Sequence, residues 1–288
     1  GLAGYRFERY RKDPRPLPRL VVDAADPAQD EAIALVAASW QVRDLVTTPT
    51  EHMGPAELEH AVRGLAQAHG GEVRVVAGDD LLAQNFPAIH AVGRASHRAP
   101  RLIELTWGDP AHPALAIVGK GVCFDTGGLD IKPADGMRNM KKDMGGAAHA
   151  IALAGLVMAR ALKVHLRLLV PAVENAIGPN AYRPGEVIAT RLSLSVEIDN
   201  TDAEGRIVLC DALAYAAELK PALLMDFATL TGAARIALGP DLPAMYFNDE
   251  ALAADYLAAA ESQGAIAVEE QHHRHATGSG TLQGRDQR

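Results

Sequence analysis

The most chemically distinctive stretch of the chain is the run 200–206, Asn-Thr-Asp-Ala-Glu-Gly-Arg, between a β-branched stretch and an alanine-rich helical pattern. In an extended backbone Asp202, Glu204 and Arg206 would project from one face, because side chains alternate. Two acids beside one base would make a site for a metal ion and an anion. Alternatively, the run begins a helix, where both acids complement the helix dipole. The run alone does not separate these interpretations.

A second charged cluster lies upstream, where residues 120–146 interleave charged side chains with glycines. Its charged residues include Lys120, Asp125, Lys132, Lys141, Lys142 and Asp143. Glycines permit tight turns and close backbone approach, so this composition is typical of a loop around a small charged ligand. The cluster begins where the apolar run 114–118 ends, and ligands bind at the carboxyl ends of strands in open α/β sheets.

The acids of the two clusters suit a pair of divalent cations. Asp125, Asp143, Asp202 and Glu204 bring four negative charges, which two such ions would balance. Carboxylates without clustered Cys or His favour Mg²⁺, Mn²⁺ or Zn²⁺. Two ions about 3.5–4 Å apart would supply a hydroxide and a Lewis acid for amide hydrolysis. Lys132 and Arg206 would then be free to stabilise an anionic intermediate.

Simpler interpretations exist for the same residues. The tripeptide 119–121, Gly-Lys-Gly, could suggest a phosphate loop, but the complete P-loop pattern is absent. The glycines could be plain turn residues and the acids a solvated face. This interpretation would explain one such cluster, but it explains two clusters at strand ends less well. Lys132 could form a surface ion pair. His149 and His165, each in an apolar segment, are interpreted as hydrogen-bonded core residues.

Hydrophobic periodicity predicts the elements that position these clusters. Strands are expected at 73–76, 102–107, 114–118, 164–170 and 223–228, and helices at 27–46, 56–69, 78–86, 147–162, 207–219 and 251–263. Residues 88–93 are expected to lead into the strand at 102–107. Strands that alternate with helices predict an α/β fold with a mostly parallel, mixed central sheet and helices on both faces.

Composition narrows the class of protein. The 288 residues can bury a sizeable core, and the formal net charge of −8 does not favour nucleic acid as a partner. The two cysteines have apolar neighbours, which predicts core thiols in a reducing compartment rather than a disulfide framework. We find neither a long apolar span nor a signal peptide pattern. The sequence therefore predicts a soluble, cytoplasmic protein that has no membrane partner.

Four segments occur in an order that resembles one known family. They are 120–128 (Lys-Gly-Val-Cys-Phe-Asp-Thr-Gly-Gly), 132–133 (Lys-Pro), 140–148 (Met-Lys-Lys-Asp-Met-Gly-Gly-Ala-Ala) and the run 200–206. Together they resemble the leucyl aminopeptidase family, the M17 cytosol aminopeptidases. The last segment is highly specific. The resemblance covers roughly residues 1–263, and it also includes the segments 43–46, 53–55, 175–184 and 228–232.

The resemblance implies a role for each residue of the two clusters. Two ions, Zn²⁺ or Mn²⁺ with Mg²⁺ or Co²⁺ as alternatives, would be bound by Lys120, Asp125, Asp143, Asp202 and Glu204. Lys132 would polarise the scissile carbonyl, and Arg206 would hold a bicarbonate that acts as general base. The substrate pocket would include Met140, Asn200, Thr229, Leu230 and Gly232, of which Met140 and Leu230 could equally be core residues.

By the same resemblance, the chain would be a leucyl aminopeptidase that acts on peptides with a free N-terminus. A hydroxide that bridges the metal ions would attack the carbonyl, a leucine-like N-terminal residue would be preferred, and a homo-oligomer, a hexamer, is implied. Alternatives are a non-catalytic scaffold, a DNA-binding member of the family, a truncated inactive fragment, or a metal-dependent phosphoesterase.

The predicted organisation is a linker or entry arm at 1–26, a catalytic domain at 27–263 and an atypical polar tail at 264–288. The resemblance implies an additional N-terminal domain and further C-terminal segments that this chain does not include. Because apolar periodicity ends near residue 263, we expect the histidine-containing tail to lie outside the packed core.

Overall fold

The computed structural model describes residues 4–13, 27–239, 242–262 and 268–269, which fall into two units, Gly1–Leu230 and Thr231–Arg288. The second unit contains helices α8 (Ala233–Leu238) and α9 (Glu250–Ser262) and the short parallel strands β9 (Ala244–Met245) and β10 (Val268–Glu269). Helix α9 confirms the helix predicted at 251–263. Of the predicted tail, only residues 268 and 269 lie among the described residues.

The first unit is built on a six-stranded sheet. Its strands are β1 (Glu72–Ala77), β2 (Arg101–Trp107), β3 (Ala114–Gly119), β4 (Gly121–Asp125), β5 (His165–Asn175) and β8 (Leu223–Phe227). The order is β1-β2-β5-β3-β8, and β4 pairs with β5. Strands β3, β4 and β8 join this sheet in parallel, whereas β1 and β2 are antiparallel to their neighbours. The predicted mixed α/β sheet is therefore confirmed.

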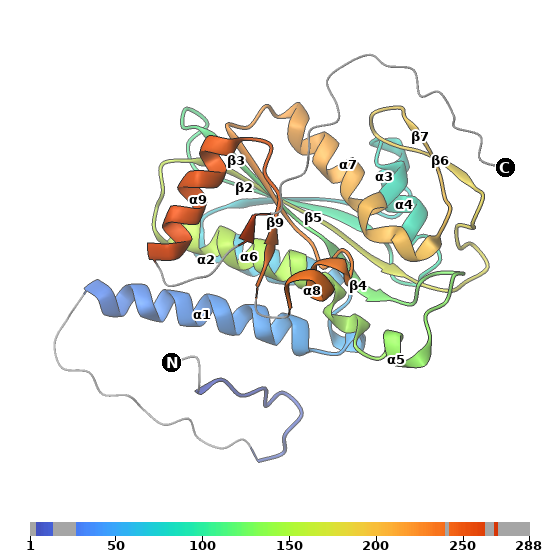
Figure 1. Ribbon diagram of the computed structural model, residues 1–288, viewed down its shortest axis with the longest axis horizontal. Helices are drawn as coiled ribbons and strands as arrows, with labels where there is room; N and C mark the ends of the chain where they lie inside the picture. Colours follow the sequence, from blue (N-terminus) through green and yellow to red (C-terminus); the bar gives the residue numbers. More distant parts are fainter. Residues whose placement is uncertain (1–3, 14–26, 240–241, 263–267, 270–288) are drawn as a thin grey trace. The chain divides into compact units, whose positions relative to one another are not determined.

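Helices cover both faces of this sheet, as the sequence predicts (Figure 1). One face carries α2 (Pro55–His69) and α6 (Gly145–Ala159), and α1 (Pro27–Thr47) packs on α6. The other face carries α3 (Asp80–Ala83), α4 (Pro87–Gly93) and α7 (Glu204–Glu218). Strand β5 separates the two cores, because its consecutive residues Leu168 and Leu169 point to opposite faces.

Residues 87–93 form helix α4 before the chain reaches β2, and the sequence analysis did not predict this helix. The cause lies far away in the sequence. Asp211 on α7 points at the start of α4, where its Oδ2 accepts hydrogen bonds from Ala88 N at 2.8 Å and Ile89 N at 3.4 Å. Free N–H groups at a helix start are normally capped by a nearby side chain. Here a residue of another helix caps them.

Asp211 also holds the loop that connects the hairpin strands β6 (Val187–Ala189) and β7 (Ser195–Glu197), because Oδ1 accepts a hydrogen bond from Arg191 N at 2.8 Å. Its side chain is fully buried, and burial raises the pKa of the carboxyl group. We expect Asp211→Ala to lower the free energy of unfolding by about 2–3 kcal/mol, because it leaves three backbone donors unpaired. Chemical denaturation measures this difference.

Asp255→Ala, at an exposed position of α9, is the matched control for Asp211→Ala and should change the free energy of unfolding by less than about 0.5 kcal/mol. Equal stability of Asp211→Ala and the unmodified chain would contradict the capping role.

His149 is exposed on α6, where its Nδ1 lies 2.7 Å from the carbonyl oxygen of Gly145 in the preceding turn. The prediction of a core histidine was therefore wrong for this residue. Helix α6 contacts both the sheet and α1, so most of its surface is apolar and buried, and apolar neighbours in the sequence do not identify its exposed positions. His165 is partly buried at the start of β5.

Candidate metal centre

The charged residues of the two clusters meet at one edge of the central sheet. Lys120 lies between β3 and β4, and Asp125 ends β4. Asp143 belongs to the short helix η3 (Met140–Met144) that leads into α6, and Glu204 is the first residue of α7. Because β3, β4 and β8 are parallel to β5, their carboxyl ends lie on the same side.

The run 200–206 begins a helix rather than continuing a strand. Residues Thr201–Ala203 form the short helix η4, and Asn200 caps it by accepting a hydrogen bond from Asp202 N at 2.7 Å. Residues two apart in a helix point to different sides. Glu204 is consequently buried while Arg206 is exposed. Of the two interpretations left open by the sequence, the extended one with a shared face is therefore wrong, and the helix start is confirmed.

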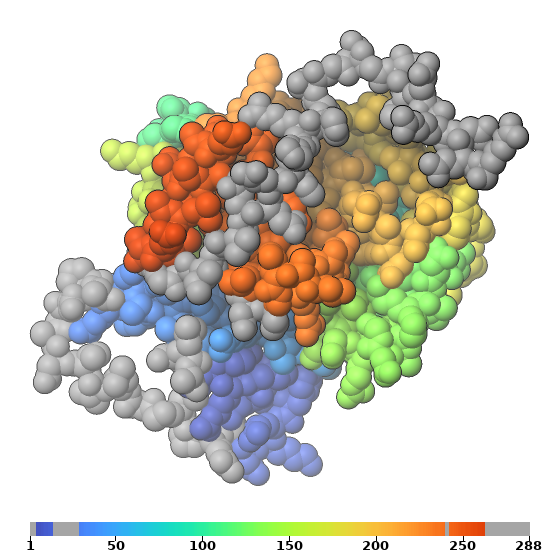
Figure 2. All heavy atoms as spheres, viewed as in Figure 1, coloured from blue at the N-terminus to red at the C-terminus, as the bar shows by residue number. Residues whose placement is uncertain are grey.

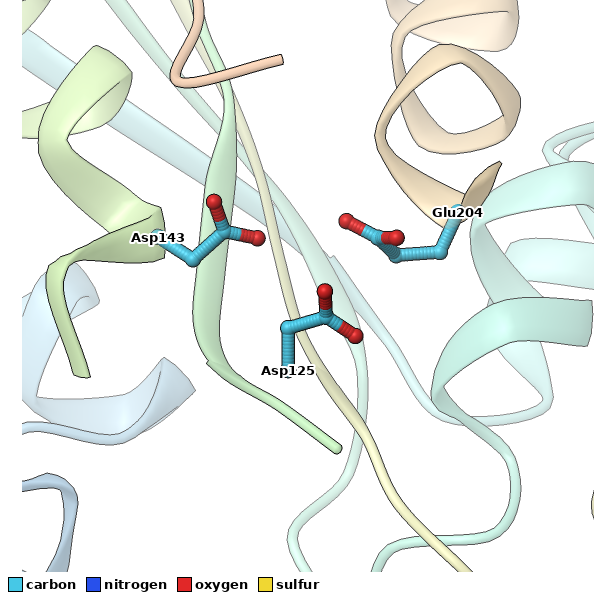
Figure 3. Close-up of side chains that lie close together, drawn as sticks. All are labelled: Asp125, Asp143 and Glu204. Atoms are coloured by element: carbon cyan, nitrogen blue, oxygen red, sulfur yellow. The ribbon is translucent and has the colours of Figure 1, made fainter. Parts of the chain in front are cut away.

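Three carboxylates converge at the middle of the site (Figure 3). One oxygen from each of Asp125, Asp143 and Glu204 lies within 4.8 Å of the corresponding oxygens of the other two. These residues retain only 2–3% of their surface exposure. Burial of three acids at such short distances is costly unless positive charge balances them.

Two lysine ammonium groups lie among these carboxylates. Lys120 Nζ is 2.8 Å from Asp143 Oδ2 and 2.9 Å from Glu204 Oε1. Lys132 Nζ is 2.9 Å from Asp125 Oδ2 and also contacts Asp202. Gly205 leaves room for Lys120, because a Cβ atom at this position would lie 2.7 Å from Lys120 Nζ. Lys142 Nζ, on a side chain that is 40% exposed, is 3.2 Å from Asp143 Oδ1, so four carboxylates share three ammonium groups.

The imbalance of charge changes the acidity of several groups. Burial, reinforced by Asp125 and Asp143 against the opposing effect of Lys120, raises the pKa of Glu204 to about 8. Burial also raises the pKa of Asp202, with a further contribution from Asp125. For Lys120, the neighbouring carboxylates outweigh burial, which by itself would lower its pKa, and the net shift is upward. The centre thus contains more acid groups than its lysines neutralise.

These residues fit divalent cations. Carboxylate oxygens are the preferred ligands of Mg²⁺ and Mn²⁺ and common ligands of Zn²⁺, and an amine nitrogen is acceptable to the softer ions. Two divalent cations would balance the four negative charges of the carboxylates. The lysines between the carboxylates would then no longer need to be protonated. The composition and burial of the site therefore support the predicted metal centre.

Metal binding should release protons. At pH 7 Glu204, with a pKa of about 8, keeps most of its proton in the metal-free chain, and a lysine can ligate a metal only as the neutral amine. Because Glu204 is mostly protonated below pH 8, a cation must displace its proton to bind there. We expect affinity for Mn²⁺ to rise between pH 6 and 8 by about tenfold per pH unit for each proton released.

Calorimetry at pH 7 in two buffers of different ionisation enthalpy measures the number of protons released on Mn²⁺ binding. Identical heats in both buffers, together with an affinity that does not depend on pH, would contradict the assignment of Glu204 as a ligand.

The remaining predicted residues occupy different places around the centre. Thr229 donates a hydrogen bond from Oγ1 to Asp143 Oδ1 at 2.8 Å, so it orients a carboxylate as well as flanking the site. Met140 is partly buried in η3, and Leu230 is 45% exposed. Gly232 belongs to the second unit, where it precedes α8. Within the described ranges, Arg206 forms no hydrogen bond or ion pair, and both Arg206 and Leu230 are open to solvent.

A group of buried polar residues lies beside the carboxylates, and sequence analysis did not predict a role for them. Asn175, Tyr182 and Thr201 are each at most 1% exposed and form hydrogen bonds to Asp125 or to one another. The only available signal was that all three lie in segments that resemble the family, Asn175 and Tyr182 in 175–184 and Thr201 in the run 200–206. The loop that carries Lys132 and the β6–β7 hairpin both reach the face shown in Figure 2, in green and yellow.

The sheet and the carboxylate centre define an α/β domain whose buried acidic site suits divalent cations. The sequence model of the cytosol aminopeptidase family, catalytic domain, matches residues 40–275. A probable cytosol aminopeptidase of Roseiflexus castenholzii is 39% identical over 277 residues, which cover 91% of this chain and 57% of that protein. The chain belongs to the cytosol aminopeptidase family.

Solved structures agree with this assignment. The cytosol aminopeptidase of Coxiella burnetii has a TM-score of 0.89 and 49% identity over 93% of this chain and 58% of its own. The bottromycin maturation enzyme BotP, whose structure was solved with Mn, has a TM-score of 0.85 and 37% identity over 93% of this chain and 59% of its own. The chain therefore spans somewhat more than half the length of these relatives.

Among the helices in the described ranges, none has both the length and the hydropathy that crossing a membrane requires.

Proposed function

We propose that this chain is the catalytic domain of an aminopeptidase that uses two divalent cations to remove the N-terminal residue, preferably leucine-like, from peptides. The observation that carries the proposal is the convergence of Asp125, Asp143 and Glu204 in a buried centre, in a chain of this family. Zn²⁺ or Mn²⁺ suits the ligands, with Mg²⁺ or Co²⁺ as alternatives. The likeness to BotP, solved with Mn, supports this choice.

In this proposal five residues hold the two ions: Lys120, Asp125, Asp143, Asp202 and Glu204. When bound, the ions would activate a water molecule and polarise the scissile carbonyl. Asp125 and Glu204 would be among these ligands, because their carboxylates converge with that of Asp143 in the buried centre. Lys120, as the neutral amine, would complete the ligand set.

Lys132 is proposed to donate a hydrogen bond to the carbonyl oxygen of the substrate. Its side chain is 14% exposed, so the ammonium group reaches the solvent-facing side of the centre. The ammonium group pairs with Asp125 and Asp202. Once cations neutralise these acids, the ammonium group can stabilise negative charge on the reacting oxygen.

Arg206 is proposed to hold bicarbonate, which would accept the proton of the attacking water. Its exposed guanidinium lies in the first turn of α7, and guanidinium groups bind planar oxyanions through two parallel hydrogen bonds. A helix start also attracts anions. Met140, Asn200, Thr229, Leu230 and Gly232 are the proposed substrate pocket, and a hexamer is the proposed assembly.

The test is hydrolysis of leucine p-nitroanilide by the metal-free chain before and after addition of Mn²⁺. We expect no turnover without metal and turnover after loading, with preference for leucine over glutamate as the N-terminal residue. A loaded chain that hydrolyses no aminoacyl anilide would refute the proposal. Parallel assays with an aryl phosphate and with duplex DNA separate the phosphoesterase and DNA-binding alternatives.

A further inference from the structure

A network of buried hydrogen bonds connects the segments that carry the proposed ligands. Its centre is Asn175, the last residue of β5, which is 1% exposed. The amide nitrogen Nδ2 lies 2.8 Å from Asp125 Oδ1 and 3.1 Å from the carbonyl oxygen of Thr201. Asp125 ends one segment, and Thr201 directly precedes Asp202 in another.

The orientation of the Asn175 amide is chemically determined. Both groups that face Nδ2 are acceptors, so only the NH₂ end of the amide can bond to them. The other end, Oδ1, is buried and has no hydrogen-bond partner among the described residues. A buried carbonyl group that lacks a hydrogen-bond partner is destabilising. The fold tolerates this cost, and in return the two donors of one side chain connect Asp125 to Thr201.

Thr201 is fixed from its other sides as well. Its Oγ1 donates to Gly127 O at 2.6 Å, and its backbone N donates to Asp130 Oδ2 at 2.7 Å. Tyr182, which is 1% exposed, donates from its hydroxyl group to Thr201 O at 2.6 Å. Thr201 therefore joins the loop after β4 to the start of α7, and its carbonyl oxygen receives both Asn175 and Tyr182.

We propose that Asn175 is a positioning residue of the metal centre, assisted by Tyr182. By holding Asp125 at a fixed distance from Thr201, Asn175 aligns Asp125 with Asp202 and Glu204 before a cation binds. Partners of metal ligands set the orientation of those ligands, and their loss typically weakens metal binding by about 10–100-fold. This inference rests on the proposed function, because it assumes that these carboxylates bind metal.

The experiment measures the affinity of metal-free chains for Mn²⁺ by electron paramagnetic resonance of the free ion. Asn175→Leu removes both donors and keeps a side chain of similar volume, and we expect it to bind about 10–100-fold more weakly. Tyr182→Phe removes only the hydroxyl group and should bind a few-fold more weakly. Asn180→Leu is the matched control, because Asn180 is exposed in the loop that follows β5 and, among the described residues, contributes only its backbone oxygen to a hydrogen bond, from Arg94.

Circular dichroism and the unfolding midpoint of each metal-free variant separate positioning from general destabilisation. A merely structural role would lower the midpoint but leave the Mn²⁺ affinity of the folded chain within twofold, and this result would overturn the inference. If Asn175→Leu does not fold, Tyr182→Phe decides by the same criterion. If the unmodified chain itself binds no Mn²⁺, both this inference and the proposed function are wrong.

Discussion

We expect Glu204→Gln to abolish high-affinity binding of divalent cations and hydrolysis of leucine p-nitroanilide together. Glu204 is 2% exposed, and its carboxylate lies among Asp125, Asp143 and the ammonium group of Lys120. The neutral amide keeps the size of the side chain but removes one negative charge and one metal-binding oxygen. Affinity for Mn²⁺ should fall by more than about 100-fold. Loss of a residue that only contacts a metal ligand typically weakens metal binding by less than this.

The control for this variant is Glu197→Gln, the same chemical change at an exposed position of β7. It should leave Mn²⁺ affinity and turnover unchanged. Because Glu204 already keeps most of its proton at pH 7, Glu204→Gln should be about as stable as the unmodified metal-free chain. A Glu204→Gln chain that retains full metal content would contradict the role of Glu204 as a ligand.

Unlike Glu204→Gln, Lys132→Met should retain the bound metal ions and lose only catalysis. Methionine keeps a long, unbranched side chain but removes the ammonium group that pairs with Asp125 and Asp202. We expect kcat to fall by about 10²–10³-fold, the effect of removing one preorganised donor to a developing oxyanion. Turnover of leucine p-nitroanilide by the Mn²⁺-loaded chain measures it.

Elemental analysis of the same Lys132→Met sample gives the number of ions bound. Lys163→Met, at an exposed position after α6, is the matched control and should behave like the unmodified chain. Loss of the bound ions in Lys132→Met would show that Lys132 supports the metal centre rather than the reaction. Unchanged kcat would exclude it from catalysis.

The sequence predicted the parts of the fold that depend on local patterns. The apolar run 114–118 predicted β3, and the alanine-rich pattern from 207 predicted most of α7. The prediction failed where a distant residue determines the structure. Helix α4 depends on Asp211, which is more than 100 residues away, and no local pattern at residues 88–93 contains this information.

For the candidate metal centre too, the sequence predicted one part and not another. Residue type and the expected strand ends were sufficient to predict that Lys120, Asp125, Asp143 and Glu204 lie close together. The backbone of the run 200–206 was ambiguous, because alternation of acids every second residue suits a strand, whereas the cap formed by Asn200 favours a helix start. The roles of Asn175 and Thr201 could not be predicted, since their partners are backbone carbonyls and a carboxylate from other segments.

The most direct test of the central claim is a Mn²⁺ titration of the metal-free chain in which bound ions and hydrolysis of leucine p-nitroanilide are measured in the same samples. A two-cation centre predicts no hydrolysis in the metal-free chain and maximal hydrolysis at two bound ions per chain. Hydrolysis that does not depend on bound Mn²⁺, or two bound ions without any hydrolysis, would contradict it.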